Sequence, residues 1–456
     1  MAWSSSDIAL VTASAEVTYA ELTGLCDWLT ASVPERALVF LRAANCLEAV
    51  AFYCACLRKG AVPLMMGKLP GSDAWELLDA EYRPEFAWVE AGSLPGREVV
   101  CSYGAYALVR LRDGSPGLHP DLALLLSTSG STGSPKLVRL SRRNLRANAE
   151  SICKYLGIEP QDRAITTLPF DYAYGISIVN SHLLAGASVV LTGEPLVSRG
   201  FWGLLRKKRA NNFGGVPFTY QMLKRLRFGE MNVPSLRYIT QAGGRLGEAL
   251  HAEFVRVCAE KGIGFCAMYG QTEATARMSY VPMERAAEKV GSIGVAIPGG
   301  ELWLEDGEGA IIERSGVEGE LVYRGPNVSM GYATCASDLM LGDEFGGVLH
   351  TGDIAWRDED GYYYVTGRKG RFCKVYGNRV GFDELEQVLL RAGIVAAVTG
   401  VDDHVTLFVE DGDPSAAMCV VAEGTGLNPW AFSAVKLDAL PRSESGKVLY
   451  SALENV

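Results

Sequence analysis

The sequence lacks a surplus of positive charge and any long hydrophobic run. Its 43 Lys and Arg residues face 53 Asp and Glu residues, which gives a formal net charge of −10 at pH 7. Proteins that bind nucleic acid or an anionic membrane need a basic surface, so this composition argues against both partners. No stretch approaches the roughly 18 consecutive apolar residues that a membrane-spanning helix needs. We therefore expect no nucleic-acid partner and no membrane association.

The sequence also lacks an ordered set of cysteines. Its 11 cysteines are scattered, and the closest pair, Cys54 and Cys56, fits neither a disulfide framework nor the C-x-x-C spacing of zinc sites. The opening segment, MAWSSSDIALVTASAEV, shows no basic stretch followed by an apolar one, which a secretory signal would show. We expect a cytoplasmic protein in a reducing compartment.

Short apolar runs alternate with longer segments of helical period through the first part of the chain. The strand-like runs are 37–40, 61–65, 122–126 and 187–191, and the clearest helical segments are 47–57 and 144–155. This alternation predicts mainly parallel α/β layers. After about Gly294 the pattern changes to short strand-like runs broken by Gly, Asp and Pro, with one helical segment at 383–392. A smaller α+β unit is therefore expected at the C-terminal end.

The predicted strand at 122–126 runs into a turn rich in Ser, Thr and Gly. The turn reads Thr128, Ser129, Gly130, Ser131, Thr132, Gly133, Ser134, Pro135 and Lys136. Small residues let the backbone approach a phosphate, their N–H and hydroxyl groups donate to its oxygens, and a lysine supplies positive charge. The turn therefore resembles a triphosphate clamp, although its order is not the Walker pattern. A flexible Ser/Gly linker is the alternative, and the apolar strand before the turn favours the clamp.

A second segment, CAMYGQTEATARMS at 266–279, brings an aromatic ring, a glycine and a carboxylate together. Tyr269 can stack on a base. Glu273 can hold Mg²⁺ beside phosphates, because Mg²⁺ prefers one or two carboxylates plus phosphate oxygens. A glutamate that opens a helix is also typical of a cap that compensates the helix dipole, so both interpretations of Glu273 stay open on the residues alone.

Taken together, TSGSTGSPK at 128–136 and YGQTE at 269–273 resemble the adenylate-forming superfamily. This superfamily includes acyl- and aryl-CoA synthetases, adenylation domains of nonribosomal peptide synthetases, and firefly luciferase. Further segments similar to that family follow in its order: VTYAEL at 17–22, LPFDYAYG at 168–175, GSIGVAIPG at 291–299, GELVYRGPNVSMGY at 319–332, HTGD at 350–353, GYYYVTGR at 361–368 and LPRSESGK at 440–447. The resemblance covers nearly the whole chain.

The resemblance implies an α/β fold with two domains. Residues 1–368 form a large, multi-layer N-terminal domain of mixed sheets flanked by helices, with the ATP and acid pockets. Residues 369–456 form a small, mobile α+β C-terminal domain that carries Lys447. Family members swing this domain about a hinge two residues after the arginine of the GR pair. That position usually holds Asp or Lys and here is Gly370, which permits large changes of backbone angle.

The activity implied is ATP-dependent activation of a carboxylic acid to an acyl-adenylate, with release of pyrophosphate and then transfer to a thiol. Two anions must meet at the α-phosphate, and unit charges about 4 Å apart repel by about 4 kcal/mol at an effective dielectric near 20. Mg²⁺ and lysines offset that repulsion. The resemblance thus implies ATP and Mg²⁺ as cofactors. It implies CoA, or the phosphopantetheine of a separate acyl or peptidyl carrier protein, as the acceptor.

The resemblance also assigns roles to individual residues. The expected catalytic residues are Lys447, Thr272 and Glu273, with Glu273 as the Mg²⁺ ligand. The expected ATP phosphate-binding residues are Thr128, Ser129, Gly130, Ser131, Thr132, Gly133 and Lys136. The expected adenine- and ribose-binding residues are Gly243, Gly244, Tyr269, Gly270, Gln271, Asp353 and Arg368. The carboxylate of Asp353 is expected to accept hydrogen bonds from both ribose hydroxyls.

The acid pocket is expected around Asp171, Tyr172, Gly175, Val216 and Gly243. Tyr172 stands where many acyl- and aryl-CoA synthetases have an aromatic or histidine gate. Asp171 raises the alternative of a stand-alone amino-acid-activating enzyme, since such enzymes pair a nearby aspartate with the substrate ammonium group. A helix cap explains Asp171 equally well. The order P-F-D-Y-A-Y-G places Asp171 beside the gate, so we favour a carboxylic acid without an α-amino group.

Two other interpretations stay open. A non-catalytic regulator that binds nucleotide or acyl-adenylate has no need of a mobile lysine, so Lys447 argues against it. An oxygenase of the luciferase type would use the adenylate for oxidation. Pyrophosphate release separates an enzyme from a binder, and a thioester product separates the two enzymes.

Overall fold

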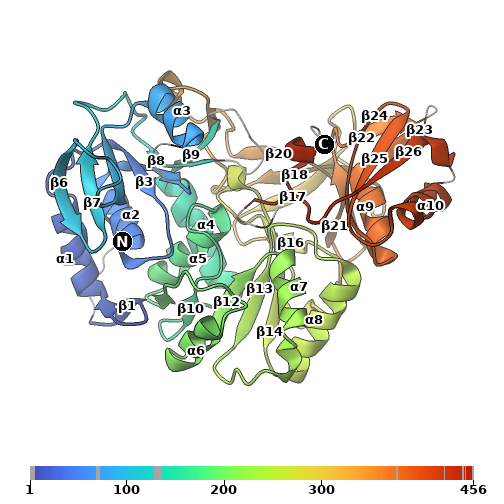
Figure 1. Ribbon diagram of the computed structural model, residues 1–456, viewed down its shortest axis with the longest axis horizontal. Helices are drawn as coiled ribbons and strands as arrows, with labels where there is room; N and C mark the ends of the chain where they lie inside the picture. The colour runs from blue at the N-terminus through green and yellow to red at the C-terminus, as the bar shows by residue number, and fades with distance from the viewer. Residues whose placement is uncertain are drawn as a thin grey trace.

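Two large sheets form the body of the protein, and a third sheet and a smaller α/β unit follow along the chain (Figure 1). The computed structural model describes residues 6–67, 72–127, 136–375, 378–425, 427–443, 446 and 448–453. The predicted α/β class is confirmed. Within these residues no helix is long and apolar enough to cross a membrane.

The first large sheet has nine strands in the order β16-β15-β14-β13-β12-β10-β11-β1-β2. Its strands are β1 (Ile8–Val11), β2 (Glu16–Thr18), β10 (Arg163–Ile165), β11 (Ser188–Val190), β12 (Asn212–Gly215), β13 (Tyr238–Gln241), β14 (Gly264–Tyr269), β15 (Ser279–Tyr280) and β16 (Val295–Ala296). The central pairs from β1 to β14 are parallel, and β2, β15 and β16 are antiparallel. The carboxyl ends of β12, β13 and β14 therefore meet at one edge.

The second large sheet has eight strands in the order β19-β9-β8-β4-β3-β5-β7-β6. Its strands are β3 (Leu38–Arg42), β4 (Val62–Met66), β5 (Phe86–Glu90), β6 (Glu98–Tyr103), β7 (Tyr106–Arg110), β8 (Leu122–Ser127), β9 (Leu137–Ser141) and β19 (Tyr332–Ala333). The centre is parallel, but both edges are antiparallel. The alternating pattern alone indicated mainly parallel layers. Short connections such as that between β6 and β7 permit only a hairpin, which makes the sheets mixed.

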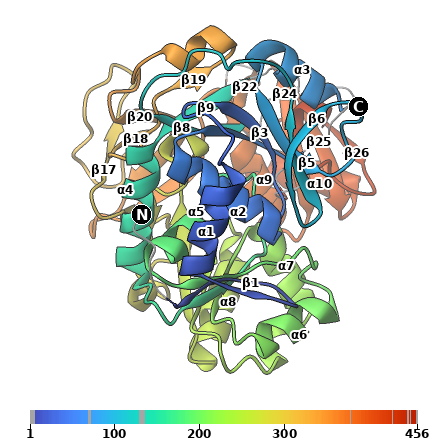
Figure 2. The same cartoon turned by 90° about the vertical axis from the view of Figure 1, so that its left-hand side faces the viewer.

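Helices α4 (Arg142–Leu156) and α5 (Ala173–Leu184) lie between the two large sheets (Figures 1 and 2). Both bury a face against each sheet, and the largest core cluster joins α2, α4, α5 and strands of the second sheet. The other helices of the body are α1 (Tyr19–Leu29), α2 (Leu47–Lys59), α3 (Asp73–Tyr82), α6 (Arg199–Lys207), α7 (Pro217–Arg225) and α8 (Glu248–Glu260).

The rest of the chain forms an antiparallel sheet and then the smaller unit. The sheet consists of β17 (Glu301–Glu305), β18 (Gly319–Arg324), β20 (Val348–Arg357) and β21 (Tyr363–Arg368). The smaller unit contains β22 (Phe372–Val375), β23 (Asn378–Gly381), α9 (Phe382–Arg391), β24 (Val395–Val401), β25 (His404–Asp411), α10 (Pro414–Thr425), β26 (Phe432–Lys436) and α11 (Tyr450–Leu453). Its core is a separate cluster drawn from β22 to β26, α9 and α10. The predicted boundary at 368/369 falls at the end of β21.

Candidate active site

The carboxyl ends of three parallel strands bring the predicted pocket residues together. Val216 follows β12, the Gly243–Gly244 pair follows β13, and Tyr269 ends β14. In a parallel sheet these ends lie at one edge, where α/β proteins bind ligands. Gly243 has a φ of +82°, and a Cβ placed there would lie 2.5 Å from the Tyr172 hydroxyl oxygen and 3.0 Å from Val216 Cγ1. Only glycine permits that close approach.

Asp353 is the centre of a polar cluster next to this edge. Its Oδ1 accepts a hydrogen bond from Arg368 Nε at 2.8 Å, and its Oδ2 accepts one from Gln271 Nε2 at 3.0 Å. The Tyr269 hydroxyl also donates to Oδ2. The Thr351 hydroxyl accepts from the Asp353 N–H at 3.0 Å and so fixes the turn before the carboxylate. The structure thus brings together four of the residues predicted to hold adenine and ribose.

Charge and burial act together in this cluster. Asp353 is buried, and its carboxylate raises the pKa of the Arg368 guanidinium. Burial, and then the nearby Asp353 charge, raise the pKa of the Tyr269 hydroxyl well above its ordinary value. Tyr269 therefore acts here as a neutral hydrogen-bond donor. A carboxylate oxygen has further lone pairs, so Asp353 can accept from a ribose hydroxyl without losing Arg368.

Glu273 and Lys136 are linked through Tyr332. The Tyr332 hydroxyl donates to Glu273 Oε1 at 2.9 Å, and Lys136 Nζ lies 3.5 Å from the centroid of the Tyr332 ring. Glu273 follows Thr272 in the short helix η2 (Thr272–Ala274). The backbone carbonyl of Glu273 accepts from the Ser329 N–H at 2.8 Å. The sequence analysis did not single out Tyr332, which joins the end of the clamp to the predicted magnesium ligand.

The residues around Glu273 fit a magnesium ion that is also held by phosphates. Among the described residues no lysine or arginine forms an ion pair with Glu273, and no group of three His, Cys, Asp or Glu side chains could hold a metal ion alone. A single carboxylate with unused lone pairs is the donor set that Mg²⁺ uses beside phosphate oxygens.

The C-terminal segment approaches two residues at the predicted acid pocket. Gly446 directly precedes Lys447, and a Cβ placed on Gly446 would lie 3.4 Å from Val216 Cγ2 and 3.5 Å from Phe218 Cβ. Arg245 Nη1 also donates to the Val365 carbonyl, which links the loop after β13 to β21. Lys447 itself, together with Thr128, Ser129, Gly130, Ser131, Thr132 and Gly133, lies outside the described residues.

Asp171 and Tyr172 face different surroundings. A Cβ placed on Gly67, after β4, would lie 2.1 Å from Asp171 Oδ2, so this carboxylate lies against the second large sheet. The Tyr172 hydroxyl instead lies beside Gly243. Gly175 packs against the Pro169 carbonyl, where a Cβ would lie 2.2 Å from the oxygen. Of these predicted pocket residues, Tyr172 is the one that reaches Val216 and Gly243.

A strained turn follows Glu273. Thr275 has a φ of +66°, which is a rare conformation for a β-branched residue. Its hydroxyl donates to the Asn327 carbonyl at 2.6 Å. The Asn327 amide nitrogen donates to the carbonyls of Ala274 and Arg277 at 2.9 and 2.8 Å. The turn directs Arg277, a residue that the sequence analysis did not single out, into the space between α4, α5 and the first sheet.

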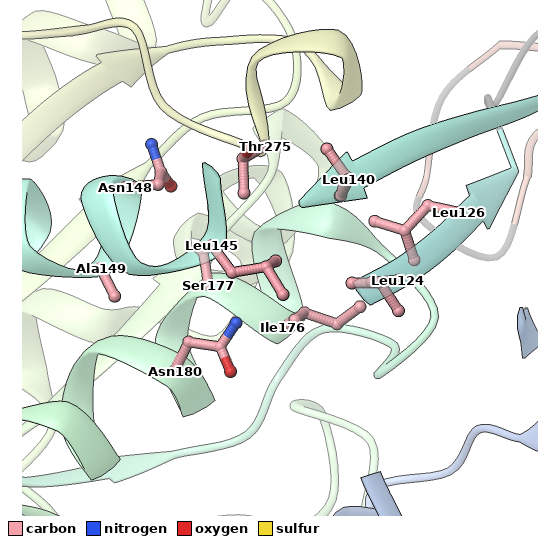
Figure 3. A pocket seen from close by; sticks show the side chains of 10 residues that line it. All are labelled: Leu124, Leu126, Leu140, Leu145, Asn148, Ala149, Ile176, Ser177, Asn180 and Thr275. Atoms are coloured by element: carbon pink, nitrogen blue, oxygen red, sulfur yellow. The ribbon is translucent and has the colours of Figure 1, made fainter. Parts of the chain in front are cut away.

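A cavity lies beside this turn, between α4, α5 and the strands β8 and β9. Leucines and Ile176 line one side, and Asn148, Asn180 and Thr275 line the other (Figure 3). The Asn148 amide nitrogen donates to the Arg277 carbonyl at 3.0 Å. Asn148, one of the residues that line this cavity, therefore holds the turn from the side of α4.

The residues before and after Gly370, the predicted hinge, form ion pairs with different parts of the protein. Arg368 and Lys369 are bound to the body, through Asp353 and through an ion pair with Glu320 at 2.7 Å. Arg371 is bound to the smaller unit, through an ion pair with Glu386 at 3.0 Å and through its contact with the Tyr450 ring. Gly370 lies between them, with a φ of +89°. Its use as a hinge stays a prediction.

Comparison with known proteins gives consistent results. A model of the family described as AMP-binding enzyme matches residues 3–333. Oxalate–CoA ligase of Arabidopsis thaliana is 31% identical over 353 residues, which cover 72% of this chain and 66% of that enzyme. The chain thus spans just under two thirds of that relative's length. Indoleacetate–CoA ligase of Aromatoleum aromaticum is 28% identical over 95% of this chain and 92% of that enzyme.

A solved structure confirms the fold over nearly the whole chain. The o-succinylbenzoate CoA synthetase of Bacillus subtilis, in complex with its acyl-adenylate intermediate, superposes with a TM-score of 0.79. The match covers 98% of this chain and 95% of that one at 24% sequence identity.

Proposed function

The chain belongs to the AMP-binding enzyme family, and we propose that it is an AMP-forming acid–thiol ligase. In the first step a carboxylate oxygen attacks the α-phosphorus of ATP, the bond to the β-phosphate oxygen breaks, and pyrophosphate leaves. In the second step a thiolate sulfur attacks the acyl carbon, AMP leaves, and a thioester forms. The thiol proton passes to solvent.

The described residues fit distinct parts of the first step. Asp353 would accept hydrogen bonds from the ribose hydroxyls. Lys136, at the end of the predicted phosphate clamp, would supply positive charge to the phosphates. Glu273 would hold Mg²⁺, which offsets the charge of the phosphates when bound. Tyr332 fixes the Glu273 carboxylate through its 2.9 Å hydrogen bond. We propose that Lys447 stabilises the charge that develops on the α-phosphate and carboxylate oxygens.

One observation carries the proposal, namely the contact of Gly446 with Val216 and Phe218. The approach of Gly446, which precedes Lys447, supports a role for Lys447 at the predicted acid pocket, although the two segments are far apart in the sequence. A protein that only binds nucleotide has no need to bring its C-terminal segment to this position. An enzyme that must neutralise two anions at one point does.

The substrate and acceptor follow from the relatives. These are named as CoA ligases of carboxylic acids, so we propose a small carboxylic acid as substrate and CoA as acceptor. The phosphopantetheine of a separate carrier protein ends in the same thiol as CoA, so it is the alternative acceptor. All 11 cysteines are free, which supports a reducing compartment such as the cytoplasm.

The amino-acid alternative depends on Asp171. Its carboxylate lies against Gly67 rather than beside Gly243, which favours an acid without an ammonium group. Amino acids therefore belong in the test as a separate set of substrates.

ATP–pyrophosphate exchange tests the proposal when it is measured with a panel of carboxylic acids and, separately, with a panel of amino acids. Exchange with a carboxylic acid, followed by a CoA thioester, is expected. Lys447→Ala should lower exchange by about 10²-fold to 10⁴-fold, which corresponds to a contact of roughly 3 to 5 kcal/mol in the transition state. Tight ATP binding without exchange for any acid would instead favour the non-catalytic binder.

A further inference from the structure

Gly247, at the start of α8, contacts the smaller unit. Its φ of −54° and ψ of 137° are open to any residue, so the backbone conformation does not require glycine here. Gly247 is also the N-cap of α8, where the side chain of Asn, Asp or Ser would accept a hydrogen bond from the first turn. A Cβ placed on Gly247 would lie 2.8 Å from Leu390 Cδ2. The close approach of Leu390 therefore explains the glycine.

Leu390 lies on the side of α9 that points away from the core of the smaller unit. The preceding residue, Leu389, is fully buried in that core, whereas Leu390 is still 36% exposed beside Gly247. In Figure 1, α9 is the helix of this unit that lies nearer to the body, and α10 lies on the outer side. The approach of Leu390 to Gly247 is therefore a contact between two surfaces and not part of either core.

Leu390 is connected through α9 to the C-terminal loop, residues 441–449. Glu386 lies one helical turn before Leu390, and its carboxylate accepts a hydrogen bond from the Tyr450 hydroxyl at 3.0 Å. Tyr450 directly follows the C-terminal loop, whose first and last residues are joined by a backbone hydrogen bond of 2.8 Å. A change in the position of α9 is therefore passed to this loop.

The sheet of the smaller unit also joins α9 to the C-terminal loop. Leu440 and Leu453, on either side of the loop, are buried with Ala397 of β24. The next strand residue, Val398, points to the opposite face of the sheet and is buried with Leu389 of α9. The sheet therefore lies between α9 and the segments that flank the loop, and we treat the smaller unit as one body.

The C-terminal loop approaches the predicted acid pocket at Gly446. A Cβ placed on Gly446 would lie 3.4 Å from Val216 Cγ2. Gly247 and the pocket residue Gly243 belong to one connection of the body, between β13 and α8. The body thus contacts the smaller unit at two points, at Leu390 and at Gly446, and both points lie on segments that follow the carboxyl ends of β12 and β13.

We infer that Leu390 and Gly247 form a docking contact that positions the smaller unit, and with it Lys447, for the adenylation step. This inference rests on the proposed function and assigns a positioning role to two residues outside the catalytic groups. Leu390 acts through the C-terminal loop and not on the reacting atoms. Gly247 leaves the space that Leu390 fills, so a larger residue at 247 would hold α9 and the loop away from Val216.

Gly247→Asn tests the contact without weakening α8. Asparagine is a preferred N-cap residue, so the Tm should equal or exceed that of wild type. Its Cβ takes the space of Leu390, so the maximal rate of ATP–pyrophosphate exchange with the most active acid of the panel should fall about 5- to 30-fold. The affinity for ATP, measured by calorimetry, should stay within about 3-fold of wild type. Gly193→Asn is the control, because a Cβ on this exposed glycine would meet no atom within 4 Å.

Leu390→Ala removes the other half of the contact. Alone it should lower the maximal rate of exchange about 3- to 10-fold, because docking loses apolar contact. In the double variant with Gly247→Asn the smaller alanine leaves room for the asparagine, so the loss should not exceed that of Gly247→Asn alone. Val401→Ala should leave the rate unchanged, because Val401 belongs to the same unit and is 70% exposed.

Trypsin digestion measures the same contact without any substrate. Lys369 and Arg371 lie on either side of Gly370, so cleavage after either residue separates the two units. A smaller unit that is released from the body exposes this segment more often. Gly247→Asn and Leu390→Ala should therefore be cleaved there about 3-fold faster than wild type or more, while the two controls match wild type.

Three results would overturn the inference without affecting the proposed function. Gly247→Asn could leave the rates of exchange and cleavage unchanged, which would show that the contact positions nothing. The losses of the two single variants could multiply in the double variant, as they do at independent sites. Slower exchange together with a lower Tm would assign Gly247 to the fold instead. Absence of exchange with every acid in the wild-type protein would refute the proposed function, and the digestion would still test the docking contact.

Discussion

Replacement of Asp353 by asparagine should weaken ATP binding far more than it changes the fold. The side chain keeps its size, but its charge disappears beside Arg368. Hydrogen bonds to a charged acceptor contribute about 1 kcal/mol more than neutral ones, and two ribose hydroxyls are involved. The new amide N–H₂ must also face either Arg368 Nε or Gln271 Nε2, which now lie 2.8 and 3.0 Å from the carboxylate. That contact between two donors adds about 1 kcal/mol, so the total loss is about 3 kcal/mol, or roughly 100-fold in ATP affinity.

Calorimetric titration with ATP and Mg²⁺ measures this loss directly. Glu320→Gln is the matched control, because Glu320 lies on the neighbouring strand β18 and pairs with Lys369 at 2.7 Å. The control removes a nearby carboxylate charge and no hydrogen bond to Asp353 itself. Glu320 Oε1 accepts from the Gly352 N–H at 3.3 Å, a bond that the glutamine oxygen keeps, so ATP affinity should stay within about 3-fold of wild type. Equal affinities for Asp353→Asn and Glu320→Gln would refute the assignment of Asp353 to the ribose.

Three other predictions concern the metal, the hinge and pH. Glu273→Gln should lower pyrophosphate exchange about 10²-fold to 10³-fold, and an unaltered dependence of exchange on Mg²⁺ would contradict its role as ligand. Gly370→Ala should lower exchange about 5- to 30-fold, because alanine at a φ of +89° costs about 1 to 2 kcal/mol. An unchanged rate would show that adenylation does not use the backbone conformation that Gly370 has here. Burial lowers the pKa of His182 and of His251 from 6.5 to about 4. At these two histidines the unfolded chain therefore binds protons as the pH falls through 6.5, whereas the folded chain binds them only near pH 4. The free energy of unfolding should fall by about 2 kcal/mol per histidine between pH 7 and pH 5, and a flat profile by urea denaturation would refute this.

The apolar runs were sufficient to predict central strands because these runs have clear ends, whereas the mixed character of the sheets was implied by the family resemblance. The runs predicted at 122–126 and 187–191 became β8 (Leu122–Ser127) and β11 (Ser188–Val190), and the helix predicted at 144–155 became α4. The family segments also predicted which residues gather at the edge of the first sheet. Asp353 lies 84 residues after Tyr269 and 82 after Gln271 in the sequence, yet all three share one hydrogen-bonded cluster.

The sequence could not predict residues whose importance comes from their surroundings. Tyr332 is one of 19 tyrosines, and only the structure shows its hydroxyl on Glu273 and its ring under Lys136. Arg277 is one of many arginines, and only the structure shows that it is buried over the Tyr174 ring. The one signal in the sequence is its place in the segment ATARMSY, where a charge interrupts a strand-like approach to β15.

The turn at Thr275 explains how the backbone holds the predicted magnesium ligand in place. Backbone strain of this kind costs about 1 to 3 kcal/mol, and here the bonds of Asn327 to Ala274, Thr275 and Arg277 oppose it. On one side of the turn the Glu273 carboxylate accepts from Tyr332, whose ring Lys136 also approaches, and on the other side Arg277 lies over the Tyr174 ring. Because the same asparagine holds both arms, it fixes the backbone that carries the predicted magnesium ligand.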